Sequence, residues 1–395
     1  GAGAPMAEPG DAAAGPAHGA EPAGDAAVED HDVVHMLWIG DGAVPDFPRK
    51  CIASYAAMGN PVHLWLYPQQ RSAEEAAAAL PQGARLRDAN EIIPLETALE
   101  IGYYHGMGPG LMWPGWSTFS DLFRYELLYR EGGWWCDADS ISVRPLREAG
   151  FPPGAHVLAT ERWRPGGYRN IILAVPKPGA PGAENVGFDF IIGGSKQEAQ
   201  AWREAQNPQL VDCCVITNSH IRAPRGSALM RACADELRPL MEAYAVQVKE
   251  SKLGDESVDW AVPTGGEGLR IFQEQAAARI GACEAEGQEL LAAVSHYAVF
   301  NPVEIDDFPG GMRVLQGERP VPAATCTVHL FGMMRANWRV LKLDMPEDLQ
   351  IAREDTNEQL LTEIRKVEAQ RIRAERQRRK EEATAAAAAT AATPP

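Results

Sequence analysis

The stretch that decides the fold covers residues 120–139 and reads SDLFRYELLYREGGWWCDAD. Ser120 is a favourable N-cap and Gly132 is a natural helix terminator, so we expect a helix of about three turns between them. Asp121 and Arg124 are three residues apart, which places them on the same face at the start of this helix. Together they can hold a polar ligand there.

The second half of the stretch predicts a buried strand that ends in two carboxylates. Residues 134–136 are apolar, and Asp137 and Asp139 follow at the carboxyl end. A regular strand would point their side chains to opposite faces, but a turn lets both converge on one ligand. Carboxylate oxygens hold Mg²⁺ or Mn²⁺, and such an ion can in turn hold a diphosphate. By itself an Asp-x-Asp pair is weak evidence, because such pairs are common on solvated turns.

The residues before this stretch indicate a parallel sheet. Apolar runs alternate with helical segments, the second of which Ser72 can cap. This alternation implies right-handed crossovers and an α/β fold, in which ligands bind beyond the carboxyl ends of the strands. The expected strands are 33–40, 62–67 and 84–87, and the expected helices are 48–58 and 73–80.

The later part of the core mixes short strands with helices. Gly, Pro and aromatic residues at 103–116 indicate a loop that lines a pocket. The expected strands are 156–160, 171–175, 187–192, 297–300 and 325–331, and the expected helices are 197–206, 227–244 and 269–279.

Composition divides the chain into four parts. Residues 1–32 are rich in Ala, Gly and Pro, and we expect them to be disordered because they bury too little apolar surface. Residues 33–345 form the folded domain. Residues 346–382 predict a long, charged, coiled-coil-type helix whose basic second half could touch a membrane surface. Residues 383–395 form a disordered Ala/Thr tail.

Charge and composition exclude some classes of function. The formal net charge is −17, which argues against bare nucleic acid as the main partner but not against a phosphate held by a metal. No apolar run reaches the roughly 18 residues that a membrane span needs. The seven Cys are scattered, and we expect reduced, mostly buried thiols. Because the chain begins with Gly, an N-terminal anchor could be missing, and the compartment stays open, the Golgi lumen included.

The stretch 120–139 resembles the sugar-nucleotide-binding region of glycosyltransferases with a DXD motif, whose usual pattern is S-D-x-x-R-Y-x-x-L-Y-x-x-G-G-x-Y-x-D-x-D. Trp135 stands where the family has Tyr. The most similar group is that of α-mannosyl-, α-galactosyl- and toxin-type glucosyltransferases. The residues that match are Ser120, Asp121, Arg124, Tyr125, Leu128, Tyr129, Gly132, Gly133, Asp137 and Asp139.

Outlying segments are similar to the same family. Trp38 occupies the place of a family Trp that lies against the nucleotide base, although a core aromatic is the alternative. Asn170 resembles the Asn of the pattern N-x-x-x-x-A-x-x-G-H-P, a sugar contact, although the His is absent here. The segment with His329, Arg335 and Trp338 is similar to the closing motif H-x-x-G-x-x-K-P-W, with one extra residue and Arg for Lys.

The resemblance implies a GT-A fold, a Rossmann-like sheet merged with a mixed acceptor half. It implies metal-dependent transfer of a hexose from a nucleotide-diphosphate sugar to a hydroxyl of a glycan, lipid or protein, with retention at the anomeric carbon. Asp137 and Asp139, the catalytic pair, and His329 would hold Mn²⁺ or Mg²⁺. The implied nucleotide-sugar contacts are Trp38, Asp121, Arg124, Asn170, Arg335 and Trp338.

Two other classes stay open at this point. In an Asp-x-Asp phosphohydrolase the first Asp is a nucleophile and the second an acid or base. Such enzymes carry the pair on their first strand with a hydroxyl two residues later, where this chain has Ile141. The third class is a transferase-like fold without activity that serves as a binding or scaffold module, for which the basic C-terminal helix is the argument.

Overall fold

The parallel half of the predicted sheet is confirmed in the computed structural model. Strands β1 (Val34–Leu37), β2 (Val62–Leu66) and β3 (Ala84–Asp88) run parallel, and β6 (Gly133–Cys136) joins β1 on its other side, also parallel. The structure describes residues 32–80, 83–102, 107–108, 111–112, 116–151, 155–162, 171–176, 190–192, 211–250, 267–285, 292–295, 297–303 and 308–330.

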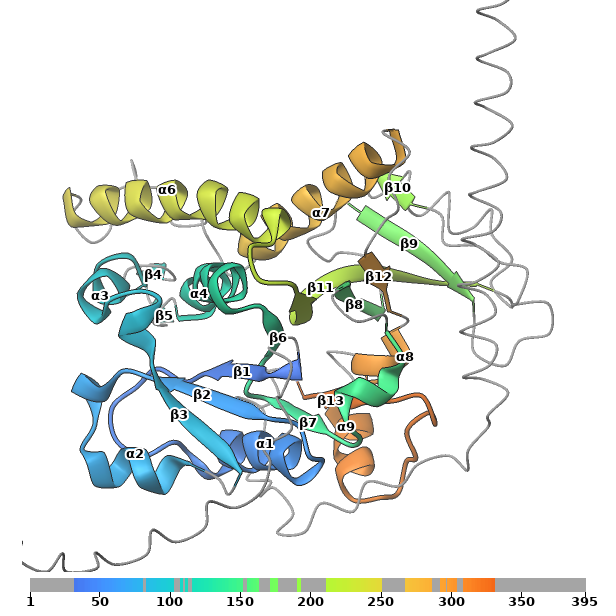
Figure 1. Ribbon diagram of the computed structural model, residues 1–395, viewed down its shortest axis with the longest axis horizontal. Helices are drawn as coiled ribbons and strands as arrows, with labels where there is room; N and C mark the ends of the chain where they lie inside the picture. The colour runs from blue at the N-terminus through green and yellow to red at the C-terminus, as the bar shows by residue number, and fades with distance from the viewer. Residues whose placement is uncertain are drawn as a thin grey trace, which may run out of the picture.

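Antiparallel strands extend this sheet beyond β6. The long strand β11 (Val211–Ala223) pairs antiparallel with β6 and with β8 (His156–Arg162) and β9 (Ile171–Pro176). Strand β10 (Phe190–Ile192) lies outside β9, and β12 (Ala292–Val294) pairs with β8. Nine described strands therefore form one mixed sheet, in the order β10-β9-β11-β6-β1-β2-β3 with β8 and β12 off this path (Figure 1). The α/β class with a mixed central sheet is confirmed.

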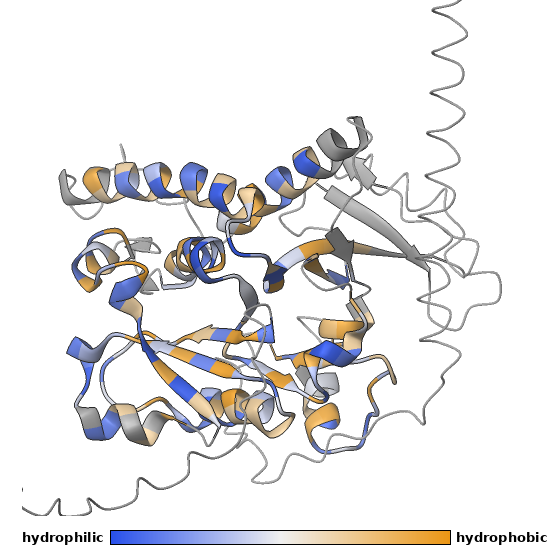
Figure 2. Cartoon of the chain, in the orientation of Figure 1, coloured by the Kyte–Doolittle hydropathy of each residue, from blue (hydrophilic) through white to orange (hydrophobic). Residues whose placement is uncertain are grey.

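Helices cover both sides of the parallel strands (Figure 1). On one side lie α1 (Asp46–Ala57) and α2 (Ala73–Ala79), and on the other α3 (Leu95–Gly102), α4 (Trp116–Glu131), α6 (Ala228–Glu250) and α7 (Glu267–Ala285). Blue and orange residues alternate along α6 in Figure 2, as expected for a helix with one face on the core. Among the described helices, none combines the length and apolar character that crossing a bilayer requires.

Short elements complete the described fold. Strand β7 (Ser140–Ser142) pairs antiparallel with β13 (Thr327–His329) in a two-stranded sheet that carries part of the candidate site. Two short helices, α8 (Tyr297–Phe300) and α9 (Phe308–Leu315), lie beside it (Figure 1). The remaining elements are the pair β4 (Met107–Gly108) and β5 (Leu111–Met112) and the 3₁₀ turns Pro68–Gln70, Ala89–Glu91 and Leu146–Ala149.

Several expectations from the sequence are wrong in detail. Helix α4 begins at Trp116, so Ser120 is not its N-cap; its hydroxyl instead donates to the carbonyl of Ser117 at 2.7 Å. Residues 297–300 are the helix α8, because four apolar residues in a row do not distinguish a strand from a buried helix. The loop expected at 103–116 contains β4 and β5. The expected helix 197–206 and the segments 1–31 and 346–395 lie outside the described residues.

Helix α4 is the centre of the core. Nearly every position from Thr118 to Leu128 is buried, the charged Asp121, Arg124 and Glu126 included. Phe123 packs edge-on against Trp65 of β2 and beside Trp135 of β6. A helix buried on all sides is normally apolar all round, so charged side chains within it mark a place where the chain needs them. The prediction of reduced, buried thiols is confirmed for five described residues, Cys51, Cys136, Cys214, Cys233 and Cys326.

Acid should destabilise the parallel sheet through His35. This side chain is 2% exposed, and burial, with the nearby His63 and Arg87, lowers its pKa to about 3. The folded protein therefore keeps His35 neutral, while the unfolded chain protonates it below about 6.5, so stability falls as the pH falls through that value. We expect this residue to account for a loss of about 2 kcal/mol between pH 7 and pH 5, measured by urea unfolding.

The variant His35→Asn isolates this contribution. Trp65 donates its indole N–H to Nδ1 of His35 at 3.1 Å, and the Asn oxygen can accept the same hydrogen bond without titrating. The loss of stability on acidification should be smaller in the variant by the same amount. An unchanged pH dependence would contradict the assignment to His35.

Candidate functional site

The Asp-x-Asp pair lies in the turn between β6 and β7. Three hydrogen bonds hold the first carboxylate and its backbone: Trp135 Nε1 donates to Asp137 Oδ1 at 2.8 Å, and the hydroxyl and amide of Ser140 donate to the Asp137 carbonyl at 2.7 and 3.1 Å. The Asp137 amide donates in turn to the carbonyl of Ser219 on β11 at 3.0 Å. The turn is therefore fixed to β7 through Ser140 and to β11 through Ser219, and it brings the two carboxylates close together, as expected.

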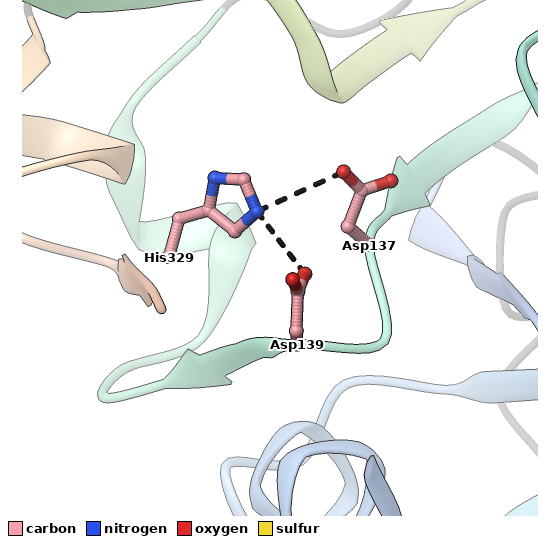
Figure 3. A group of neighbouring side chains, drawn as sticks. All are labelled: Asp137, Asp139 and His329. Atoms are coloured by element: carbon pink, nitrogen blue, oxygen red, sulfur yellow. Dashed lines mark hydrogen bonds and ion pairs between the residues drawn. The ribbon is translucent and has the colours of Figure 1, made fainter. Parts of the chain in front are cut away.

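His329 reaches the same place from the far end of the described chain. The antiparallel ladder of β7 and β13 sets His329 opposite Ser140, and the amide of Leu330 donates to the Asp139 carbonyl at 2.9 Å. The imidazole Nε2 lies 3.1 Å from Asp139 Oδ1 and 3.8 Å from Asp137 Oδ2 (Figure 3). This convergence was expected only from the resemblance, because 190 residues separate the two partners.

These three side chains have the chemistry of a divalent-metal site. Each offers one ligand atom, and the three atoms lie within 4.8 Å of one another. Two carboxylate oxygens and one imidazole nitrogen suit Mn²⁺ or Mg²⁺ and leave positions for further ligands. The Asp137 and Asp139 side chains are 24% and 22% exposed, so a ligand can reach them. Within the described ranges this is the one group of at least three such residues so arranged.

The surroundings shift the pKa values of the two carboxyl groups in opposite directions. Burial and the neighbouring Asp139 raise the pKa of Asp137, against the pull of Arg124. The pKa of Asp139 is held below its usual value despite burial, because His329 lies beside it and hydrogen-bonds to it. An added cation would favour the charged form of both carboxylates.

Arg124 is the internal counter-ion of the site. Its Nη2 lies 3.1 Å from Asp121 Oδ1 and 3.3 Å from Asp137 Oδ1, and the guanidinium stacks over the Trp135 ring at 4.8 Å. The Arg124 and Asp121 side chains are only 5% and 6% exposed. Burial raises the pKa of Asp121 to about 7, although Arg124 opposes this. The expectation that Asp121 and Arg124 share one face of the helix is confirmed, although they lie beyond its first turn; the ion pair between them, and the contact of Arg124 with the first Asp of the Asp-x-Asp pair, were not predicted.

Asn218 is a site residue that the sequence analysis missed. It projects from the irregular part of β11, where the register with β8 shifts between Ile216 and Ile221. Its amide nitrogen donates to Asp121 Oδ1 at 2.9 Å and to the Tyr125 hydroxyl at 3.0 Å. One signal could have found it: the spacing N-x-x-x-x-A-x-x-G is met by Asn218 with Ala223 and Gly226.

Gly268, at the start of α7, was also missed. Its carbonyl accepts the Tyr125 hydroxyl at 2.9 Å, and a Cβ at this position would overlap the side chain of Asp121. No larger residue fits against Asp121 unless the carboxylate moves. The first turn of α7 thus forms one wall of the site.

The other expected contacts are placed only in part. Trp38 follows the carboxyl end of β1, the strand beside β6, and is half-buried against the core on the α1 side of the sheet. It therefore lies at the same sheet edge as the Asp-x-Asp turn. Its contact with a nucleotide base stays a prediction. Asn170, Arg335 and Trp338 lie outside the described residues.

Comparisons with known proteins give only distant structural likeness. No protein-family model matches the chain, and a search of curated proteins finds no match. Among solved structures it is similar to the PaToxG glycosyltransferase (13% identity, 65% of this chain and 72% of that one, TM-score 0.34). It is also similar to mouse xyloside xylosyltransferase 1 (11% identity, 75% of this chain and 97% of that one, TM-score 0.35). A third similar structure is the ligand-free glycosyltransferase domain of the YGT toxin (11% identity, 67% of this chain and 80% of that one, TM-score 0.33). At these TM-scores the likeness is one of general outline, and function must be argued from the site itself.

Proposed function

We propose that the protein is a metal-dependent glycosyltransferase of the GT-A type that moves a hexose from a nucleotide-diphosphate sugar to a hydroxyl acceptor, with retention. The observation that carries the proposal is the convergence of Asp137, Asp139 and His329 at the carboxyl edge of the parallel strands. An acidic chain can bind a diphosphate at such a place only if a cation compensates the carboxylates.

The position of each site residue indicates its role in the proposed reaction. Asp139 and His329 would hold Mn²⁺ or Mg²⁺ with help from Asp137, and the ion would stabilise the negative charge that develops on the leaving diphosphate. Asp121, whose Oδ1 is held by the amide of Asn218, would accept hydrogen bonds from sugar hydroxyls. Arg124 would keep Asp121 and Asp137 in place, and its short contacts leave it less free to bind the donor than the sequence implied.

The outer contacts complete the proposed donor site. Trp38 would stack on the nucleotide base, Asn170 would contact the sugar, and Arg335 and Trp338 would contact the nucleotide diphosphate. Stacking of a base on an aromatic ring contributes about 1–3 kcal/mol. The acceptor would be a hydroxyl of a glycan, lipid or protein, and the basic residues near 371–380 could bring the enzyme to an anionic membrane surface.

A donor screen tests the proposal. The full chain is incubated with Mn²⁺ and a panel of UDP- and GDP-sugars, and released nucleotide is measured with and without EDTA. A transferase should hydrolyse one donor slowly, and EDTA should stop the release. A phosphohydrolase would prefer a simple phosphomonoester such as p-nitrophenyl phosphate, and a scaffold protein would turn over neither. Either of these two results would contradict the proposal.

A further inference from the structure

A second, buried cluster of polar side chains lies next to the candidate metal site and contacts it through His329. It joins α1, β7, β11 and β13 around the imidazole of His220, which is 0% exposed. The His220 ring stacks on Phe300 (5.4 Å between centroids, 18° between planes) and meets His329 edge-on (5.8 Å, 84°). The other members are Tyr55, Ser140, Ser219 and Thr327, which are also buried.

The hydroxyl groups of this cluster leave the His220 ring one consistent hydrogen-bonding pattern. The Ser140 hydroxyl donates its one proton to the Asp137 carbonyl at 2.7 Å. The Tyr55 hydroxyl, 2.7 Å from Ser140 Oγ, must therefore donate to Ser140. The Thr327 hydroxyl likewise donates its proton to the Phe300 carbonyl at 3.0 Å. A hydroxyl has only one proton to donate, so Tyr55 and Thr327 can only accept from the imidazole.

The tautomer of His220 follows from this pattern. Its Nε2 lies 3.2 Å from the oxygens of both Tyr55 and Thr327, so Nε2 carries the proton. Its Nδ1 is then the acceptor for the Ser219 hydroxyl at 3.1 Å. Every hydrogen bond of the imidazole is thereby used within the protein.

We propose that His220 is a positioning residue for the metal site. Through Tyr55 and Ser140 it fixes the carbonyl of Asp137, and through Thr327 and the edge-on ring contact it fixes the backbone and ring plane of His329. The imidazole therefore joins the two segments that carry the candidate ligands, while its own two nitrogens are taken up by hydroxyl groups. This inference rests on the proposed function, because it assumes that the three side chains bind a metal.

Mn²⁺ affinity of the full chain tests the proposal, measured by the electron paramagnetic resonance signal of free Mn²⁺. His220→Phe keeps the stack on Phe300 but removes both ring nitrogens, and we expect affinity to fall about 10- to 100-fold, as for other groups that orient metal ligands. His220→Gln can place an amide N–H where Nε2 lies and should recover most of this loss. Tyr55→Phe removes only the hydroxyl link and should shift affinity in the same direction.

A matched control separates positioning from general loss of stability. Ile216→Ala cuts a fully buried side chain on the same strand, outside the cluster, and should lower the free energy of unfolding without changing Mn²⁺ affinity. If His220→Phe and Tyr55→Phe both bind Mn²⁺ like the wild type, or if Gln is no better than Phe, the positioning role is wrong. If the wild type itself binds no Mn²⁺, the metal site fails first, and the proposed function fails with it.

Discussion

Asp139→Asn is expected to lower Mn²⁺-dependent donor hydrolysis by about 1000-fold, at the upper end of what the loss of one charge-stabilising group costs. The side chain keeps its shape and can still hydrogen-bond to His329, 3.1 Å away. What it loses is the negative charge, and with it the strongest attraction of the site for a divalent ion. Nucleotide release at saturating donor, followed over a Mn²⁺ titration, measures the effect.

The control for this variant is Asp46→Asn. Asp46 is an exposed acid on α1 whose ion pairs are with Arg49 and Lys50, so the substitution makes the same change of charge away from the site. Its activity and Mn²⁺ dependence should match those of the wild type. Release that persists in Asp139→Asn at low Mn²⁺ would show that the metal ligand has been misassigned.

The parallel half of the fold could be predicted because its signals are local. Buried parallel strands are short runs of mostly apolar residues, such as 34–37 and 62–66, and such runs can be recognised from the local sequence. Gly132 adopts a φ of +73°, a left-handed conformation that Gly takes without strain, and the predicted end of α4 at this residue is therefore confirmed. The predicted start of α4 was wrong because Ser can also lie inside a helix, where its hydroxyl bonds back to a preceding carbonyl, as Ser120 does to Ser117.

The antiparallel half carries weaker signals. Within β11 the residues 217–220 read Thr-Asn-Ser-His, a composition typical of a turn. They belong to an irregular strand whose polar groups are used at the site: Asn218 contacts Asp121, and the His220 ring meets His329 edge-on. Local composition cannot show this, since their partners lie about a hundred residues away along the chain. Only the resemblance placed His329 near Asp139, and spacing alone could not have done so.

Arg124→Met should lower the free energy of unfolding by about 3–5 kcal/mol, the range found when one partner of a buried ion pair is removed. The substitution leaves Asp121 (6% exposed) without its cation and removes one of the contacts of Asp137. Urea unfolding of the full chain, with and without Mn²⁺, measures the loss. Arg231→Met is the matched control, because Arg231 and its partner Asp235 are both more than half exposed, and we expect almost no change there.

Two further conditions separate the electrostatic cause from lost packing. Mn²⁺ should restore part of the stability of Arg124→Met, since an ion bound at Asp137 and Asp139 replaces one of the two contacts that Arg124 made. Lowering the pH from about 8 to about 6 should reduce the difference in the free energy of unfolding between Arg124→Met and the wild type. Asp121 already has a pKa of about 7, and without Arg124 it takes up a proton more readily, which removes the buried charge. If neither Mn²⁺ nor pH changes this difference in the free energy of unfolding, Arg124 acts through its contact with the Trp135 ring rather than as the counter-ion of the site.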